Sequence, residues 1–189
     1  MIMLSQTSFG YGAASALLCS YFVADILLVA AVAKGLDMKG TARAVSDFNL
    51  LPTRLIRPVG FLLPLLETLF AMGLIAESLR VPAALGAAGL LCAFTFAIAV
   101  TIFRGRRIVC NCFGALGSGE VGELSLVRNG LLLASLAIVL ISALFGDASG
   151  TVPLSDKLTL WVLSVPIALT FVLSMEVLGL RTAKSRAVS

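Results

Sequence analysis

Five long apolar stretches, almost free of charged residues, constrain the fold of this chain more than any other feature. They cover residues 11–33, 59–76, 81–103, 130–146 and 158–175. Because about 20 apolar residues are enough for a helix to cross the hydrocarbon core of a membrane, the sequence predicts an all-α, polytopic membrane bundle. We expect five transmembrane helices, four forming a core and one added to it, within a single integral membrane domain that covers residues 1–189.

The composition supports this prediction, since 59% of the residues are apolar and only 13% are charged. A soluble domain of this size could not hide so much apolar surface from water. A secreted globular enzyme, a disordered protein and a nucleic-acid-binding module are therefore excluded. Membrane lipid is the expected surrounding, and no nucleic-acid partner is expected.

The connections between the predicted spans differ in character. Residues 77–80 join the second and third spans, and so short a link forces an antiparallel helical hairpin. Within 34–58, apolar residues recur at helical spacing among basic ones, which predicts a short amphipathic helix at the membrane interface. The connection 104–128 contains five glycines and two cysteines, so we expect an irregular loop with a functional role.

The distribution of Lys and Arg predicts the orientation. With five spans, one side of the membrane carries only Arg80 and Lys157, and the other side carries the remaining twelve basic residues. By the positive-inside rule, the N-terminus lies outside and the C-terminus and the cysteine loop lie in the cytoplasm, at a bacterial inner membrane. No Lys or Arg precedes the first apolar stretch, so we expect this span to be retained rather than cleaved as a signal.

The cysteine loop contains the one motif with evident chemistry, Cys110-Asn111-Cys112. Two thiols separated by one residue close a strained disulfide, which is more oxidising and more readily exchanged, and Asn111 can adopt the turn that this ring needs. The neighbouring Arg106 and Arg107 would stabilise a thiolate over a thiol. We therefore predict that Cys110 and Cys112 are a catalytic pair for thiol–disulfide exchange.

Other interpretations of the same thiols stay open. They could be inert, they could bind a soft cation of the copper or mercury type in a membrane carrier, or the protein could be a non-catalytic scaffold for a redox partner. Zinc would need two further ligands, and the chain has no histidine to supply them. The nearby arginines would also repel a cation, so we predict no resident metal. Cys19 and Cys92 lie singly within predicted spans, as small apolar residues usually do.

Two carboxylates within the apolar stretches, Asp25 and Glu67, are costly unless they are paired or protonated. We expect both to face the bundle interior, and we expect Glu67 to be protonated or hydrogen-bonded. Lys34 follows Asp25 by nine residues, about 13 Å along a helix, so the two should not form a close pair. The carboxylates could form a proton or quinone site beside the cysteine pair, or they could simply tie helices together.

Several segments resemble the MauE branch of the MauE/DoxX-like redox-associated membrane proteins, over roughly residues 15–145. The resemblance is carried by Lys34, 48–52, 64–67, the RGRRIVCNCFG segment at 104–114, and 125–129. It implies a role in maturing the disulfide-rich small subunit of methylamine dehydrogenase together with a thioredoxin-like partner, and the DoxX relatives imply a link to quinone. By position, the family pattern reaches Cys110, Cys112, Phe113, Gly114, Glu67 and Lys34.

These observations predict a membrane thiol–disulfide redox protein, possessing an oxidoreductase activity if the cysteine pair turns over. Its partners would be a thioredoxin-like protein and an exported client that acquires disulfides, with quinone as an electron acceptor. One conflict follows, because disulfides of exported proteins form outside the cytoplasm while the charge count places the cysteine loop inside. Either the loop folds back into the bundle, or electrons cross the membrane, or Arg106 and Arg107 are functional charges that distort the count.

Overall fold

The computed structural model describes residues 11–105, 123–145 and 153–187, and over these residues the chain is helical without any β-strand. The elements, in chain order, are α1 (Tyr11–Leu36), α2 (Met38–Asp47), α3 (Thr53–Ile75), the 3-10 turn η1 (Glu77–Leu79), α4 (Arg80–Phe103), α5 (Glu123–Phe145) and α6 (Leu154–Ala187). Five of the helices are long and apolar enough to cross a membrane. The prediction of an all-α, multi-pass membrane bundle with five spans is confirmed.

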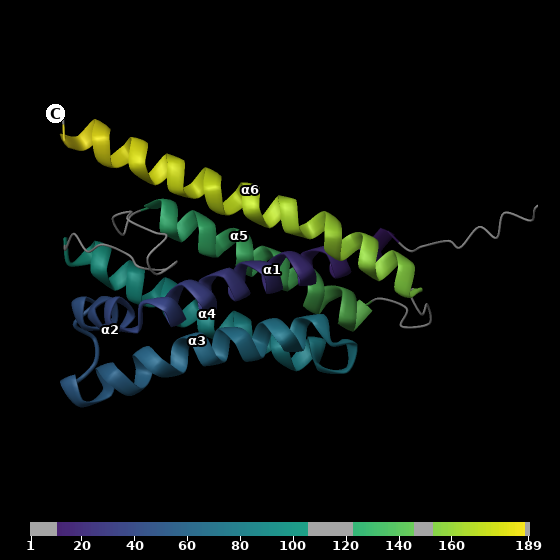
Figure 1. The fold of residues 1–189 in the computed structure, drawn as a ribbon, viewed down its shortest axis with the longest axis horizontal. Coiled ribbons are helices and arrows are strands. Elements are labelled where there is room, and N and C mark those ends of the chain that lie inside the picture. Colours follow the sequence, from purple (N-terminus) through teal and green to yellow (C-terminus); the bar gives the residue numbers. More distant parts are fainter. Residues whose placement is uncertain (1–10, 106–122, 146–152, 188–189) are drawn as a thin grey trace, which may run out of the picture.

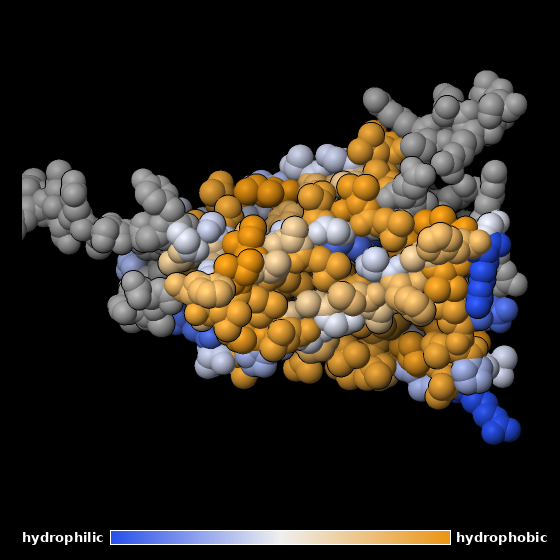
Figure 2. All heavy atoms as spheres, turned by 180° about the vertical axis from the view of Figure 1, so that it is seen from behind, coloured by the Kyte–Doolittle hydropathy of each residue, from blue (hydrophilic) through white to orange (hydrophobic). Residues whose placement is uncertain are grey.

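Helix α1 is the centre of the bundle (Figure 1). It packs against α3, α5 and α6, while α4 closes the other side by packing against α3 and α5. As a result, 61% of the α1 span is buried inside the protein, against at most 28% of any other span. The outer faces of the other helices form the broad hydrophobic surface seen in Figure 2, as expected of helices that face lipid.

Polar side chains of α1 fix two of its neighbours. Ser20 donates a hydrogen bond of 2.8 Å to the Leu74 carbonyl near the end of α3, and Lys34 contacts α3 further along. Asp25 instead faces α6, where Ser164 donates to it. These contacts set the rotation of α1, because each polar group must turn toward its partner and away from lipid.

The predicted hairpin between the second and third spans is present, and small residues hold its arms together. A Cβ atom added at Gly73 of α3 would lie 2.6 Å from the Ala83 Cβ of α4, and one added at Gly86 would lie 2.3 Å from the Phe70 ring. The two helices therefore approach more closely than larger side chains would permit. Gly89 has open space around it and plays no such part.

A sharp corner joins α1 to α2 and holds the end of α1 in place. The Asp37 side chain caps α2 by accepting a hydrogen bond of 2.8 Å from the Gly40 N–H. The Thr41 hydroxyl lies 3.0 Å from the Asp37 carbonyl and 3.3 Å from that of Lys34. The corner consequently ties the last turn of α1, which carries Lys34, to the first turn of α2.

Helix α2 is the amphipathic helix predicted for the first long connection. It packs on α3, where a Cβ at Gly60 would lie 3.3 Å from the Ala42 Cα, so the two backbones nearly touch. After α2 the chain turns at Asn49, which has a φ of 49°; asparagine tolerates this left-handed conformation better than most residues. The turn directs the chain back into α3.

The end of the bundle that carries α2 is also the basic end. The carboxyl ends of α1, α4 and α6 and the amino ends of α3 and α5 gather there (Figure 1), and hydrophilic side chains project from it in Figure 2. Among the residues whose burial is described, its exposed basic residues are Lys39, Arg43, Arg54, Arg57 and Arg104. Lys34 and Arg128 belong to the same end but are buried or half-buried.

Several helices extend beyond the predicted apolar stretches: α3 begins at Thr53 rather than at 59, α6 continues to Ala187 rather than ending at 175, and α5 begins early. The change at α5 bears on the bundle interior. The apolar stretch starts at residue 130 and the loop was expected to run to residue 128, but α5 already begins at Glu123. Arg128 and Asn129 are therefore helical residues that face the bundle. A helix extends into polar sequence where its side chains find partners, and the Asn129 amide donates to the Thr95 hydroxyl of α4 at 3.2 Å.

Candidate functional site

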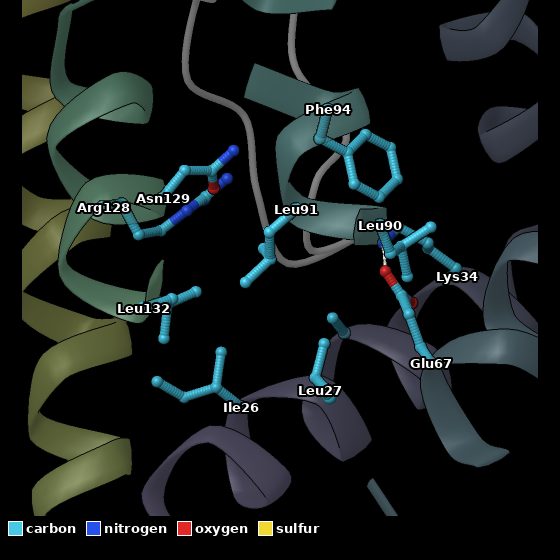
Figure 3. A pocket seen from close by; sticks show the side chains of 11 residues that line it. Ile26, Leu27, Lys34, Glu67, Leu90, Leu91, Phe94, Arg128, Asn129 and Leu132 are labelled. Carbon is cyan, nitrogen blue, oxygen red and sulfur yellow. Dashed lines mark hydrogen bonds and ion pairs between the residues drawn. The ribbon is translucent and has the colours of Figure 1, made fainter. Parts of the chain in front are cut away.

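A buried ion pair joins α1 to α3 near the basic end of the bundle. The Lys34 Nζ donates a hydrogen bond to the Glu67 Oε1, and the two side chains form a salt bridge (Figure 3). Lys34 is 4% exposed and Glu67 is 2% exposed. Since removing two charges from water costs several kcal/mol per ion, this pair is an expensive feature of the fold.

Aromatic and cationic groups from two further helices surround the pair. The Phe94 ring of α4 has its centroid 5.2 Å from the Lys34 Nζ, which is within the range of a cation–π contact. Arg128 of α5 is close enough to interact electrostatically with both charges, repelling Lys34 and attracting Glu67. Four helices thus contribute to one electrostatic cluster.

A small cavity of about 40 Å³ lies beside this cluster. It is lined by Ile26, Leu27, Ala30, Lys34, Glu67, Leu90, Leu91, Phe94, Arg128, Asn129 and Leu132, most of which Figure 3 labels. A water molecule needs about 10–15 Å³ measured in this way, whereas pockets for drug-sized ligands usually span about 300–1,000 Å³. The cavity therefore has room for water, and a quinone ring does not fit in it in this conformation.

The second oxygen of Glu67 is unusual. Oε2 is buried and has no hydrogen-bond partner among the described residues. Leaving a buried charged acceptor unsatisfied costs more than the 1–3 kcal/mol estimated for neutral groups. Because Glu67 lines a cavity with space for water, a water molecule is the natural donor for this oxygen.

Hydrogen bonds between α4 and α5 explain how Arg128 reaches the cavity. Asn129 bonds to Thr95, whose own hydroxyl donates to the Leu91 carbonyl at 2.7 Å, so the first turns of α5 are held against α4. Arg128 precedes Asn129 and is carried to the cavity by the same contact. In α3, the buried Pro64 precedes Glu67 by less than one helical turn.

Asp25, by contrast, is not part of this cluster. Its Oδ2 accepts a hydrogen bond of 2.7 Å from the Ser164 hydroxyl and its Oδ1 accepts one of 3.3 Å from the Trp161 indole, both from α6. Lys34 pairs instead with Glu67 of α3. This agrees with the expectation that Asp25 and Lys34, which are far apart along one helix, do not form a close pair. The structure thus brings Lys34 and Glu67 together and leaves Asp25 apart.

The residues predicted from the cysteine motif lie outside the described residues. These are Arg106, Arg107, Cys110, Asn111, Cys112, Phe113 and Gly114. Their two anchors are described: α4 ends at Phe103, followed by Gly105 with a φ of 63°, and α5 begins at Glu123. Both helices pack against each other and line the cavity.

The other two cysteines lie singly in spans, and one of them packs against the core. Cys19 is half-buried against the apolar core, and Cys92 is exposed on α4. Over the described part of the chain, His, Cys, Asp and Glu side chains form no group of three or more that could hold a metal ion.

Sequence reasoning missed two members of the cluster. Phe94 gives no signal in the sequence, because it is one apolar residue within an uncharged span. Arg128 was expected in the loop, although the Arg128-Asn129 pair directly before an apolar stretch could have suggested polar contacts inside the bundle.

Comparisons with known proteins agree on one family. Residues 12–142 match the family model described as methylamine utilisation protein MauE. Proteins of that name from Methylophilus methylotrophus and Paracoccus denitrificans are similar to this chain: the first is 34% identical over 173 residues, 90% of each chain, and the second is 36% identical over 124 residues, 65% of this chain and 66% of the relative. A third, from Paracoccus versutus, is 39% identical over 114 residues, 60% of this chain and 61% of the relative. No solved structure matches the chain.

Proposed function

Because this chain belongs to the MauE family of methylamine utilisation proteins, we propose that it is a membrane-embedded thiol–disulfide redox protein. Its Cys110 and Cys112 exchange disulfides with a thioredoxin-like partner. The exchange supports the oxidative maturation of an exported, disulfide-containing client of the methylamine dehydrogenase small-subunit type.

The observation that carries this proposal is the position of the two thiols in the chain relative to the buried cluster. Cys110 and Cys112 belong to the connection between α4 and α5, the two helices that pack together at the basic end and supply Phe94 and Arg128 to the cavity. A reactive pair is thus linked by short stretches of chain to an electrostatic site within the bundle. A scaffold that only binds a redox partner has no need of a buried ion pair at this place.

The exchange itself needs no group beyond the thiols and a partner disulfide. A thiolate of Cys110 or Cys112 attacks one sulfur of the partner disulfide, whose second sulfur leaves as a thiolate, and a mixed disulfide forms. The neighbouring cysteine loses its proton and attacks the mixed disulfide. The pair ends as a disulfide and the partner as a dithiol, reduced by two electrons. In the reverse sequence a partner thiolate attacks the Cys110–Cys112 disulfide, and the partner ends as a disulfide and the pair as a dithiol; this is the direction that oxidative maturation and a quinone acceptor require. Quinone is the proposed final acceptor, reached outside the small cavity.

We place the protein in the bacterial inner membrane with its N-terminus outside, on the basis of the basic end of the bundle. The cysteine pair then faces the cytoplasm and electrons cross the membrane to serve a client outside. Labelling of sealed vesicles with a membrane-impermeant thiol reagent tests this arrangement, and we expect modification of Cys110 and Cys112 from the cytoplasmic face. Modification from the outer face would reverse the orientation.

Trapping of a mixed disulfide tests the exchange. Replacing the resolving thiol stalls the reaction at its intermediate, so either Cys110→Ser or Cys112→Ser should accumulate an adduct with a thioredoxin-like protein that reductant removes. Mass spectrometry of the purified complex identifies the adduct. In the intact protein, alkylation without reductant should leave part of the pair unmodified, because it is already a disulfide.

Matched variants separate the alternatives. Cys92→Ser removes an exposed thiol outside the motif and should form no adduct. A protein that lacks both motif cysteines should form no adduct either. Co-purification of the partner with neither single variant forming an adduct would support a scaffold. Stoichiometric copper or mercury bound through the two thiols, without exchange, would support a soft-metal carrier.

A further inference from the structure

The Lys34–Glu67 pair is built differently from a contact that only joins two helices. A buried ion pair is often no more stabilising than apolar residues of the same volume, so α1 and α3 could be held together without charge. Ser20 already performs that task in the same interface through a hydrogen bond to the Leu74 carbonyl. The pair also keeps one carboxylate oxygen, Oε2, without a partner among the described residues.

Among the described residues, few charges face Glu67, and each can be assigned to its helix. Lys34 of α1 binds it directly, and Arg128 of α5 acts on it at longer range. Helix α4 has no charged residue between Val81 and Phe103, and presents Phe94 to the cavity. The Lys39 and Arg43 side chains of α2 are exposed at the end of the bundle.

The space beside Glu67 is suited to water. The cavity of about 40 Å³ exceeds the space that one water molecule occupies. Its polar lining comes from Lys34 and Glu67 on one side and from Arg128 and Asn129 on the other (Figure 3), and the rest of the lining is apolar. A water molecule beside Glu67 would have the carboxylate and the Lys34 side chain as its polar partners, the lower limit of the two to four that a buried water requires. Water there would donate to Oε2 and would give the carboxylate a means of exchanging protons.

We propose that Glu67, Lys34 and the adjoining cavity form a hydrated proton-binding site. The Glu67 carboxylate takes up a proton delivered by water and returns it by the same route. Burial favours the neutral acid, whereas the positive charges of Lys34 and Arg128 favour the ionised carboxylate. These opposing influences are what let the site both take up and release a proton.

The role of the site rests on the proposed thiol exchange. A motif cysteine must lose a proton to attack, and the sulfur that leaves the partner disulfide later gains one. The electron pair of the attacking sulfur forms the new S–S bond, and that of the broken bond stays on the leaving sulfur. Glu67 holds the released proton between these two events. It acts through water and is a proton-holding residue rather than a catalytic one.

Infrared difference spectroscopy on the full chain in lipid nanodiscs tests the site. When the pH is lowered, a carbonyl band of a protonated carboxylic acid should appear, shift in heavy water, and disappear in Glu67→Gln. At a fixed pH, Arg128→Gln should increase the intensity of this band because a positive charge is removed. Arg54→Gln, which changes an exposed residue of the same end, should leave the band unchanged.

Two further variants keep the test decisive. If Glu67→Gln unfolds because Lys34 is left without a counter-charge, the double variant Lys34→Gln/Glu67→Gln removes both charges and serves as the reference. Asp25→Asn should leave the Glu67 band in place. Absence of a Glu67 band at every pH at which the bundle stays folded, or a band that heavy water does not shift, overturns the site.

The redox dependence is measured separately. Oxidation of the reduced protein should change the Glu67 band, and an unchanged band in protein whose thiols have been shown to oxidise overturns the proton-holding role. If the thiols never form a disulfide, the proposed function fails, while the pH-dependent band still decides whether the hydrated site exists.

Discussion

Two carboxylates lie within the spans of this protein, and their surroundings differ. Glu67 is held by a cation, with one oxygen lacking a partner among the described residues and a cavity beside it. Asp25 is held by two neutral donors of α6, one to each oxygen. A carboxylate whose oxygens are both satisfied by neutral groups is typical of a structural tie. A carboxylate that faces a cation and a cavity with room for water has the features of a site that changes its charge.

The two residues also differ in burial, since Glu67 is buried and Asp25 is half-buried. Both residues interrupt apolar stretches and both would be expensive if left alone. Their partners separate them in addition to their burial. The following predictions test this separation, from the largest expected effect to the smallest.

Removing the cation should be the most damaging change. Lys34→Met leaves Glu67 buried without its counter-charge, and we expect a loss of about 3–5 kcal/mol in the free energy of unfolding. Reversible denaturation in mixed micelles measures the loss. The double variant Lys34→Met/Glu67→Leu removes both charges and should recover most of the stability, and failure to recover would show that the damage comes from packing.

Replacing the other carboxylate should cost less. Asp25→Leu leaves the Trp161 N–H without its acceptor, while the Ser164 hydroxyl can donate instead to the Trp161 carbonyl, which lies 2.7 Å away. We therefore expect a loss of about 1–3 kcal/mol and a loosening of α6, measured by the rate of cross-linking between cysteines introduced in α1 and α6. A loss as large as that of Lys34→Met would contradict the distinction between the two carboxylates.

The smallest effect concerns the indole contact alone. Trp161→Phe removes one hydrogen bond of 3.3 Å and should cost about 0.5–1.5 kcal/mol. Trp161 is the single tryptophan of the chain, so its fluorescence in the unmodified protein reports on Asp25 directly. Asp25→Asn should alter the emission, and Glu67→Gln should not; a change in both would mean that the two carboxylates are coupled.

The architecture could be predicted from the sequence because the length and purity of apolar stretches determine how many helices cross a membrane. The amphipathic α2 and the short hairpin also followed from local patterns. The ion pair could not be predicted in this way, since Lys34 and Glu67 are separated by 33 positions and meet only if the right faces of α1 and α3 meet. Arg128 was assigned to the loop because α5 begins at Glu123, before its apolar stretch starts. The chemistry of Cys110 and Cys112 stays a prediction, since both lie outside the described residues.

The hairpin of α3 and α4 has an electrical consequence. Its tip, between the two closely packed arms, carries Glu77 and Arg80, and the two residues between them are uncharged. When a hairpin inserts, its tip crosses the whole bilayer, and moving one elementary charge against a membrane potential of 100 mV involves about 2.3 kcal/mol. Because the two charges at this tip cancel, its transfer involves almost no net electrical work, and the membrane potential neither drives nor opposes the passage of the tip across the bilayer.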